Sequence, residues 1–503
     1  MRPPTAELRS ICAIPTDQGN LTIASPGDVE PSTRQHLRNA LHTSMVKVCP
    51  ANTWAGSCHL SSCPYPVLVN NKHQAEIEKL NEIVVKVLDD IVPRWWKDTA
   101  AKFPERMPLL PYEEKLLRWL DTLGTDMLRP FKECRGSWRP DFLVEKHTDQ
   151  GREGEEFFRI CEINARFTWN GFMMSALGQQ ALSDMGVYRE GICSGTDSQK
   201  ITDGLQNLYN PDLPLFLLRG EEHGYDIHLY THYARTVLDQ RVRMIKADDL
   251  RLIPHQGSLG GYKLCCVADP KDLFKTPKIN FLVNEEGEHL EEIHQMGLEL
   301  QQREIHAFDY EMLQQISLRC FNDMRTLLLV HDKRMLGIML EEVDSLVARQ
   351  VISPSEAGLL QQGICPTILP GSHQMTQFIE QCRLHPNHKD EYILKAVRDG
   401  KGEGIVFGDN MTHESWMDRL EDQRSPHISP RGVTSIVQRK IRQAKYDVLL
   451  RENEGVQNFP LIGTYHVVKG QFLGLGVWRS SPDAVCAISY GGAWMCSVKQ
   501  TDP

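Results

Sequence analysis

The amino-acid sequence predicts an α+β protein with an α/β middle region and a strand-rich carboxyl-terminal third. Three observations carry this prediction. Apolar residues recur every three to four positions across residues 72–96, which is the period of an amphipathic helix. An apolar run at 213–218, a glycine-bearing loop and a helical pattern at 225–238 follow one another as in an α/β unit. Between 392 and 490, short apolar runs alternate with Gly, Asp and Lys turns, which is typical of strands.

The remaining elements are justified in chain order. Residues 1–65, rich in Pro, Ser, Thr and Cys, are expected to be irregular. A second helix is expected over 113–128, directly after Pro111. Strand-like runs at 141–145 and 157–163 flank a polar connection that contains glycines, which indicates a β-hairpin with a solvated loop.

Farther along, helix and loop are expected over 172–210, and strands at 262–267 and 279–283 are expected to repeat the α/β unit. A strand at 325–330 is expected to lead into a helix at 333–350. The strands expected in the last third are 392–397, 433–438, 461–468, 471–477 and 485–490.

The composition narrows the class of protein. The chain has 503 residues and a formal net charge of −10, so it offers no basic surface for nucleic acid. No apolar run approaches the length of a membrane span, and the N-terminal residues hold no apolar signal core. The 14 cysteines are therefore expected to be reduced thiols in a cytoplasmic protein.

A glycine-rich loop after a predicted strand is the strongest local signal. Lys395 and Arg398 bring positive charge to it, and Asp399 precedes three glycines at alternate positions, Gly400, Gly402 and Gly404. Glycines let backbone N–H groups approach phosphate oxygens, and a carboxylate can hold Mg²⁺ against a polyphosphate. Read alone, the segment is equally consistent with a surface hairpin that has a charged tip.

The second strand of the predicted hairpin carries a candidate metal pair. Strand alternation places Glu162, Asn164 and Arg166 on one face. A carboxylate and an amide oxygen two residues apart suit a hard cation. Taken alone, a half-buried strand with a solvated polar face remains the favoured alternative.

Further charged residues lie near these signals. Arg139 and Asp141 begin the partner strand of the hairpin, where a structural salt bridge is the alternative. Lys333 stands at the expected strand–helix junction, where it either reaches a phosphate or is a solvated residue of the first turn. Arg166, Thr168 and Asn170 follow the metal strand and are candidate substrate contacts. Residues 219–226 follow a strand at the end where open α/β sheets bind ligands.

Taken in chain order, these motifs resemble one group of ligases. Arg-x-Asp comes first, then Glu-x-Asn, then Lys333, then the lysine–glycine loop. The order resembles the ATP-grasp ligases of the eukaryotic glutathione synthetase and glutathionylspermidine synthase type. In ordinary ATP-grasp chains the metal-binding carboxylate and asparagine follow the phosphate-binding lysine, whereas here they lie far upstream of Lys395. The final stretch, 461–479, is similar to the glutathionylspermidine synthase tail.

The resemblance implies an α+β ATP-grasp fold of the glutathione synthetase type, with mixed sheets and an α/β middle domain. It implies an irregular N-terminal segment at 1–65 and a helical and β-hairpin part with metal ligands at 66–205. An α/β substrate-side domain at 206–320 and an ATP-grasp nucleotide-binding part at 321–503 would follow.

The resemblance also implies ATP and Mg²⁺ as cofactors and assigns residues to them. The implied magnesium ligands are Asp141, Glu162, Asn164 and Asp399. The implied ATP contacts are Lys333, Lys395, Gly400, Gly402, Gly404 and Gln438. The arginines implied to face the transferred phosphoryl group or its surroundings are Arg139, Arg398 and Arg479.

The implied reaction activates a small-molecule carboxylate as an acyl phosphate and joins it to an amine, with release of ADP and phosphate. The chain departs from the family pattern at Ala396, where proline usually follows the lysine, and at Asp399, where glutamate is commoner. The small hydroxylated residues after Glu-x-Asn are replaced by 167–170, so a γ-glutamyl substrate is not implied. A catalytically silent nucleotide-binding scaffold and a kinase that stops at the phosphorylated acid are the alternatives, and a homodimer is left open.

Overall fold

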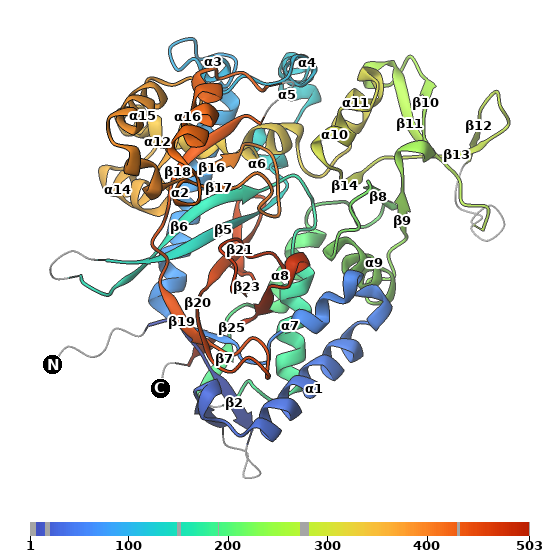
Figure 1. The fold of residues 1–503 in the computed structure, drawn as a ribbon. Coiled ribbons are helices and arrows are strands. Elements are labelled where there is room, and N and C mark those ends of the chain that lie inside the picture. Colours follow the sequence, from blue (N-terminus) through green and yellow to red (C-terminus); the bar gives the residue numbers. More distant parts are fainter. Residues whose placement is uncertain are drawn as a thin grey trace.

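The computed structural model describes residues 7–15, 21–147, 152–189, 191–271, 281–429 and 433–501. Helices pack around several separate sheets, and the chain is α+β (Figure 1). None of the helices in these ranges is long and apolar enough to cross a bilayer.

The central sheet is built from two distant parts of the chain. The predicted hairpin is confirmed as β5 (Ser137–Lys146) and β6 (Glu156–Asn164), which pair antiparallel. β5 also pairs with β21 (Ile462–Val468), and the order continues to β23 (Trp478–Ser480) and β24 (Ala493–Met495). β22 (Gln471–Leu475) pairs with β21. Residues of the carboxyl-terminal strands therefore lie beside the hairpin.

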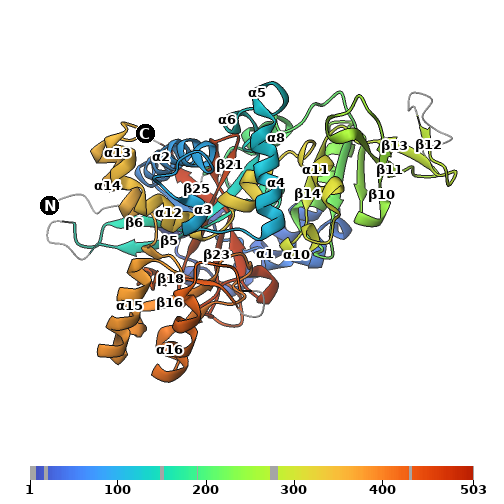
Figure 2. The same cartoon turned by 90° about the horizontal axis from the view of Figure 1, so that it is seen from above.

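A second sheet forms a unit with two helices in the last third of the chain. Its order is β15 (Thr367–Ile368), β18 (Ser435–Arg439), β16 (Tyr392–Ala396) and β17 (Val406–Phe407). α15 (His373–Leu384) and α16 (His413–Glu421) lie beside this sheet (Figure 2). Phe378, Trp416 and Val437 share one apolar cluster, which fixes the two helices against the sheet.

The expected α/β unit is present. β8 (Leu215–Arg219) lies between β14 (Met296–Glu299) and β9 (Val242–Ile245), parallel to both, and α9 (Asp226–Thr236) follows β8. The expected repeats at 262–267 and 279–283 are wrong as α/β units. β10 (Leu250–Pro254), β11 (Tyr262–Val267), β13 (His289–Glu292) and β12 (Leu282–Val283) form an antiparallel sheet instead (Figure 1, upper right). Residues 279–280 lie outside the described residues.

The irregular structure expected for 1–65 is wrong in its described part. α1 (Pro31–Val48) is an 18-residue helix, with proline at its first turn. Its buried face consists of Leu37, Leu41 and Met45, which are spaced by four residues. Because the other positions of the helix are mostly polar, this apolar pattern is weak in the sequence. β2 (Cys12–Pro15) and β3 (Leu21–Ala24) pair before it.

The two ends of the chain share a sheet. Its order is β1 (Arg9–Ser10), β4 (Val67–Val69), β25 (Ser497–Gln500) and β7 (Ile192–Ser194). The parallel pairing of β4 with β25 ties the N-terminal part to the end of the chain. The predicted domain bounds remain a prediction. The central sheet and this terminal sheet each join strands from different predicted domains.

The long predicted helix is confirmed as α2 (Asn71–Arg94). The helix expected over 113–128 divides into α4 (Pro111–Thr122) and α5 (Gly124–Met127), because Gly124 adopts φ +68°. The other helices and strands are α3 (Phe103–Arg106), α6 (Phe131–Cys134), α7 (Phe172–Asp184), α8 (Ser198–Gln206), α10 (Gln302–Ile305), α11 (Tyr310–Ser317), α14 (Pro354–Gly363), β19 (Lys445–Val448) and β20 (Gln457–Pro460).

Three expected elements differ from the structure. The strand expected at 325–330 is a π-helix, Thr326–Val330, because a short apolar run buried on all sides has no period that separates strand from helix. The helix expected at 333–350 divides into α12 (Arg334–Glu341) and α13 (Val343–Ala348). The strand expected at 485–490 is wrong, since Ile488–Tyr490 forms a 3-10 turn before Gly491 at φ +91°.

Candidate functional site

The register of the hairpin brings the predicted metal residues together. Asp141 pairs with Glu162, and Arg139 pairs with Asn164. Asn164 Nδ2 lies 3.2 Å from Asp141 Oδ1 and 3.2 Å from Glu162 Oε1. Three oxygen-bearing side chains therefore converge on one face of the central sheet, as cross-strand pairing requires.

Two lysines from the neighbouring elements meet this face. Lys395 lies on β16, and Lys333 precedes α12. Glu162 Oε2 is 3.5 Å from Lys333 Nζ and 3.7 Å from Lys395 Nζ. Burial acts to raise the pKa of Glu162, but the two ammonium groups outweigh it and hold this pKa well below its ordinary range. The carboxylate is thus ionised between two buried cations.

A β-bulge in the hairpin explains how the two sheets are joined. The register passes from the pair Asp141–Glu162 to the pair Phe142–Ile160, which leaves Cys161 without a ladder partner. Its carbonyl oxygen accepts a hydrogen bond from Lys395 Nζ at 3.1 Å and from Gln438 Nε2 at 3.3 Å. The bulge therefore orients the lysine toward the adjacent carboxylate.

Two predicted arginines share one carboxylate. Arg139 Nε donates to Asp141 Oδ1 at 3.1 Å, and Arg139 Nη1 donates to the carbonyl of Asn170 at 3.3 Å. Arg479, on β23, donates to Asp141 Oδ2. With Asn164 as a third donor, Asp141 is 4% exposed and positions both guanidinium groups.

Four predicted site residues do not line the cavity described below, namely Lys333, Arg398, Thr168 and Gly404. Arg398 donates to Glu113 Oε1 at 2.7 Å and to Asp332 Oδ2 at 3.0 Å. Its side chain is therefore directed away from Asp141 and Glu162. Thr168 is fully buried and bonds with the backbone of Leu298. Gly404 lies under the loop, where an added Cβ would come within 2.8 Å of Ala396 Cβ. Arg398, Thr168 and Gly404 were predicted because each lies in a predicted motif or close to it in sequence. Closeness in sequence does not determine the direction of a side chain.

A cavity of about 520 Å³ contains the remaining predicted residues, and Lys333 contacts two of its lining residues, the Glu162 carboxylate and the Asp399 carbonyl. Apolar and amide groups line one end, namely Leu143, Cys161, Cys365, Ile393, Phe407 and Gln438. The charged centre is formed by Arg139, Asp141, Glu162, Asn164, Lys395 and Arg479. The far end is formed by Arg166, Trp169, Asn170, Glu222, Tyr225, Asp226 and Glu299.

Glycines shape the loop across this cavity. Gly402 has φ +82°, and an added Cβ would lie 2.1 Å from Val485 Cγ1, so the position accepts only glycine without displacement. Between the glycines, Lys401 Nζ lies 2.9 Å from Glu222 Oε1. The loop therefore extends from the charged centre to the far end.

The oxygen donors fit a hard cation of the magnesium kind. Within the described ranges no group of three or more His, Cys, Asp or Glu side chains is arranged to hold a metal. The candidate set is instead two carboxylates and one amide, which suits Mg²⁺ when phosphate oxygens or waters complete its ligands. Asp399 lines the same cavity, and its role as a fourth ligand stays a prediction.

Sequence reasoning missed the acidic far end. Glu299 ends β14, and Asp226 begins α9, so both lie where the parallel strands of the α/β unit end. The segment 219–226 was expected near a ligand for this reason, but Glu299 comes from a strand that sequence did not predict. Its signal is an acidic residue that closes a short apolar run.

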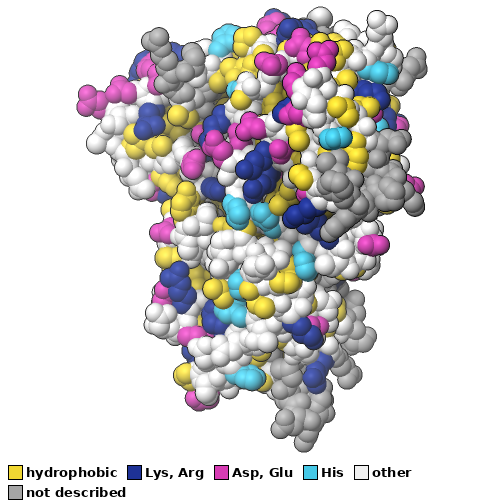
Figure 3. Space-filling view, turned by 90° about the vertical axis from the view of Figure 1, so that its right-hand side faces the viewer, with side chains coloured by type: hydrophobic (Ala, Val, Ile, Leu, Met, Phe, Trp, Pro, Cys, Tyr) yellow, Lys and Arg dark blue, Asp and Glu magenta, His cyan; other side chains and the backbone are white. Residues whose placement is uncertain are grey.

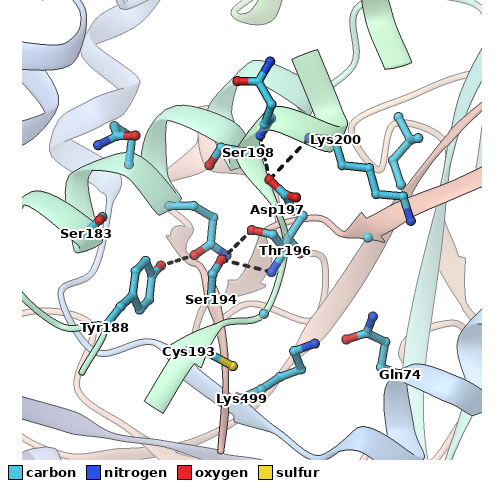
Figure 4. A pocket seen from close by; sticks show the side chains of 16 residues that line it. Gln74, Ser183, Tyr188, Cys193, Ser194, Thr196, Asp197, Ser198, Lys200 and Lys499 are labelled. Carbon is cyan, nitrogen blue, oxygen red and sulfur yellow. Dashed lines mark hydrogen bonds between the residues drawn. The ribbon is translucent and has the colours of Figure 1, made fainter. Parts of the chain in front are cut away.

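A second cavity, of about 600 Å³, lies elsewhere, between the loop before α8 and β25 (Figure 4). Its polar groups are largely bonded to one another. Tyr188 donates to Gln179, Gln179 donates to the carbonyl of Ser497, and Ser194 donates to the carbonyl of Thr196. It contains none of the predicted site residues.

The surface shown in Figure 3 mixes charges of both signs. Lys and Arg side chains are interspersed with Asp and Glu side chains there, with no broad basic patch on this face.

Comparisons with known proteins identify the family and the fold of the chain. The AnkG N-terminal domain family matches residues 80–329. The chain is similar to the ATP-grasp enzyme AnkG of Aspergillus thermomutatus, with 33% identity over 469 residues that cover 93% of this chain and 95% of the relative. Its fold is similar to that of a glutathione synthetase-like effector, GSS30, from Globodera pallida, in its apo form. That structure has 11% identity and a TM-score of 0.52, and the match covers 93% of this chain and 98% of the effector. The fold is thus an ATP-grasp fold of the glutathione synthetase type, and the chain belongs to the family of ATP-grasp enzymes that includes AnkG.

Proposed function

We propose that this protein is an ATP- and Mg²⁺-dependent ligase that forms an amide bond between a small-molecule carboxylate and an amine. The observation that carries the proposal is the single cavity in which Glu162 and Asn164 face Lys395 beside Arg139. Cationic, anionic and amide groups are needed together for phosphoryl transfer to a carboxylate, which depends on positioning and charge neutralisation.

Each residue group fits one part of the nucleotide complex. Lys333 and Lys395 are buried ammonium groups suited to phosphate oxygens, and the apolar end with Gln438 suits a nucleotide base. Glu162 and Asn164, with Asp141 beside them, would hold Mg²⁺. When bound, the metal would neutralise charge on the phosphates.

The chemistry needs no protein nucleophile. An oxygen of the substrate carboxylate attacks the γ-phosphorus of ATP, the bond to the β-phosphate oxygen breaks, and ADP leaves. The amine nitrogen then attacks the acyl carbon, inorganic phosphate leaves, and the amine loses a proton. Arg139, held by Asp141 and by the Asn170 carbonyl, lies where it can stabilise charge on the transferred phosphoryl group. The loop at 399–405 would exclude water from the acyl phosphate.

Hydroxylamine tests the proposal without knowledge of the amine. Purified protein is incubated with ATP, Mg²⁺, hydroxylamine and a panel of carboxylic acids, and hydroxamate and phosphate are measured. Hydroxamate that requires both ATP and an acid shows that an activated acyl group forms and contradicts the silent scaffold. Because hydroxylamine also traps an acyl phosphate that a kinase releases, the two enzymes are separated without hydroxylamine, with a panel of amines and measurement of product mass. Phosphate release with an amide product supports the ligase, and ADP formation that requires the acid and gives no amide with any amine indicates a kinase.

A silent scaffold gives a third outcome in the same assay. Nucleotide binding by calorimetry with no phosphate release on any acid would contradict the ligase. A variant control, Lys395→Met, removes a group on the cavity wall, and hydroxamate that this variant forms at the wild-type rate when ATP is well below the wild-type KM arises from a contaminant.

A further inference from the structure

The far end of the cavity holds buried carboxyl groups that have no cationic partner among the described residues. Glu299 and Asp226 are each 3% exposed, and Glu222 lies on the loop beside them. Neither Glu299 nor Asp226 forms a salt bridge with a cation in the described residues. A buried carboxylate without a cationic partner is costly, and such sites are found where a ligand supplies the missing charge.

Both carboxyl oxygens of Asp226 accept hydrogen bonds from the backbone. Its two oxygens accept from the N–H groups of Met173 and Met174 at 3.1 and 3.0 Å, at the start of α7. This contact satisfies free amides of a helix end, so Asp226 has a structural role as well as its charge.

Only one of the two carboxyl oxygens of Glu299 accepts a hydrogen bond within the described residues. Its Oε1 accepts from the Trp169 N–H at 2.9 Å. Its Oε2 has no donor among the described residues, although the side chain is almost fully buried at the cavity wall. The same oxygen lies 3.8 Å from the ideal Cβ position of Gly224, so the turn at Gly224 lies directly beside it. This unpaired oxygen is the observation that points to a ligand.

The neighbouring cations are engaged elsewhere. Arg166 Nη1 donates to the carbonyl of Arg398 at 3.3 Å, and no ion pair joins it to Glu299 within the described ranges. Lys401 pairs with Glu222 from the glycine loop across the cavity. Within the described ranges, neither cation therefore forms an ion pair with Glu299, whose second carboxyl oxygen remains available to a ligand.

We propose that Glu299, with Asp226 and Glu222 beside it, forms a subsite for a positively charged nitrogen group, an ammonium or a guanidinium, on the carboxylic acid substrate. The assignment rests on the proposed ligase function. The acid, rather than the amine, is chosen because the subsite adjoins Arg139. Asn170, whose carbonyl holds Arg139, directly precedes the turn into α7, whose first amides bind Asp226. An acid whose carboxylate reaches Arg139 would thus extend its other end toward Glu299.

Matched pairs of acids test the subsite. The cationic members are β-alanine, γ-aminobutyrate and L-arginine, and their partners without that charge are butanoate, pentanoate and L-citrulline. Each acid is measured by hydroxamate formation and by calorimetric binding in the presence of Mg²⁺ and a non-hydrolysable ATP analogue. We expect at least one cationic acid to bind about tenfold or more tightly than its partner, as a charge-assisted contact requires.

Variants locate the effect at Glu299. Glu299→Gln keeps an oxygen for the Trp169 N–H and removes the charge, so the preference for the cationic acid should disappear while nucleotide binding is unchanged. Glu299→Asp keeps the charge at a shorter reach and should retain part of the preference, which separates loss of charge from faulty folding. Glu221→Gln is the matched control. Glu221 is exposed on the loop that carries Glu222, and it pairs with Arg303 at the surface.

The outcomes separate the subsite from the ligase. Hydroxamate from uncharged acids with no preference for cationic ones would support the ligase and overturn the subsite. A preference that survives in Glu299→Gln would also overturn it, as would failure of every cationic acid to bind a protein that binds nucleotide. Binding of cationic acids that Glu299→Gln abolishes, without any hydroxamate, would support the subsite and contradict the ligase.

Discussion

Substitution of Glu162 by glutamine tests the charge balance of the nucleotide centre. The side chain lies 3.5 Å from Lys333 Nζ and 3.7 Å from Lys395 Nζ, and both lysine side chains are 5% exposed. The glutamine variant keeps the shape and the amide contact with Asn164 but leaves the two ammonium groups without their common counter-ion.

The distances set the size of the effect. At an effective dielectric constant of about 20, each contact corresponds to an attraction of about 4 to 5 kcal/mol. The Glu162 side chain is 20% exposed, so water screens part of this attraction. The energy of burying the carboxylate is recovered in the variant, which offsets a further part. We therefore expect a net loss of about 3 kcal/mol in the free energy of unfolding, as is usual when a buried ion pair loses one partner.

Nucleotide should reverse the sign of the difference between variant and wild type. Without Mg²⁺, Glu162 repels the phosphates of ATP, so Glu162→Gln should bind ATP more tightly than wild type and be stabilised more by it. With Mg²⁺, the missing ligand should weaken binding instead. Urea unfolding gives the stability, and calorimetry with and without Mg²⁺ gives the affinities.

Two results would refute this reasoning. One is a variant as stable as wild type in the absence of nucleotide, and the other is an unchanged ATP affinity in the absence of Mg²⁺. Glu155→Gln is the control on the same hairpin, because Glu155 pairs with Arg152 at the surface and should alter neither quantity.

Four further predictions follow from the same geometry. Lys395→Met should raise the KM for ATP at least about tenfold in steady-state hydroxamate assays, because a charge-assisted phosphate contact is lost. Arg139→Lys should lower kcat about 10²- to 10³-fold while calorimetric ATP binding stays at the wild-type value, since the forked contact acts on the transferred group. Gly402→Ala should displace the loop from Val485 and speed its cleavage in limited proteolysis, and unchanged cleavage would contradict the packing. Burial raises the pKa of Asp226 from 3.8 to about 6, so the native state holds this proton more tightly than the unfolded chain. Its contribution of about 3 kcal/mol to stability is present below pH 3.8 and is lost as the pH rises through about 6, and Asp226→Asn should flatten this part of the unfolding free energy measured in urea.

The charged centre was predictable from sequence because strand alternation is a strict rule. Once the hairpin is recognised, alternation places Asp141 on the same face as Arg139 and Glu162 on the same face as Asn164. The register in the structure brings the two pairs together. The glycine-rich loop indicated Lys395, whose distance in sequence hides its closeness in space to Glu162. Strongly periodic segments such as α2 were predictable for the same reason.

The parts that sequence did not predict depend on tertiary contacts. The run Thr326–Val330 resembles a strand in sequence because its last four residues, 327–330, are apolar, and its π-helix is set by burial on all sides. The direction of the Arg398 side chain depends on Glu113 and Asp332, which lie far from it in sequence. Both accept hydrogen bonds from its guanidinium group. The bulge at Cys161 depends on a register that strand patterns alone do not fix.

The two ends of the cavity carry opposite charge, and this separation bears on the substrate. At the nucleotide end, buried ammonium groups outnumber the carboxylate between them. At the other end, Glu299 has an unpaired oxygen, and the cation that pairs with Glu222 in the described residues is Lys401 of the glycine loop. An acid with a cationic group at its far end would be drawn into one orientation, with its carboxylate toward Arg139, because the reverse orientation would place like charges together.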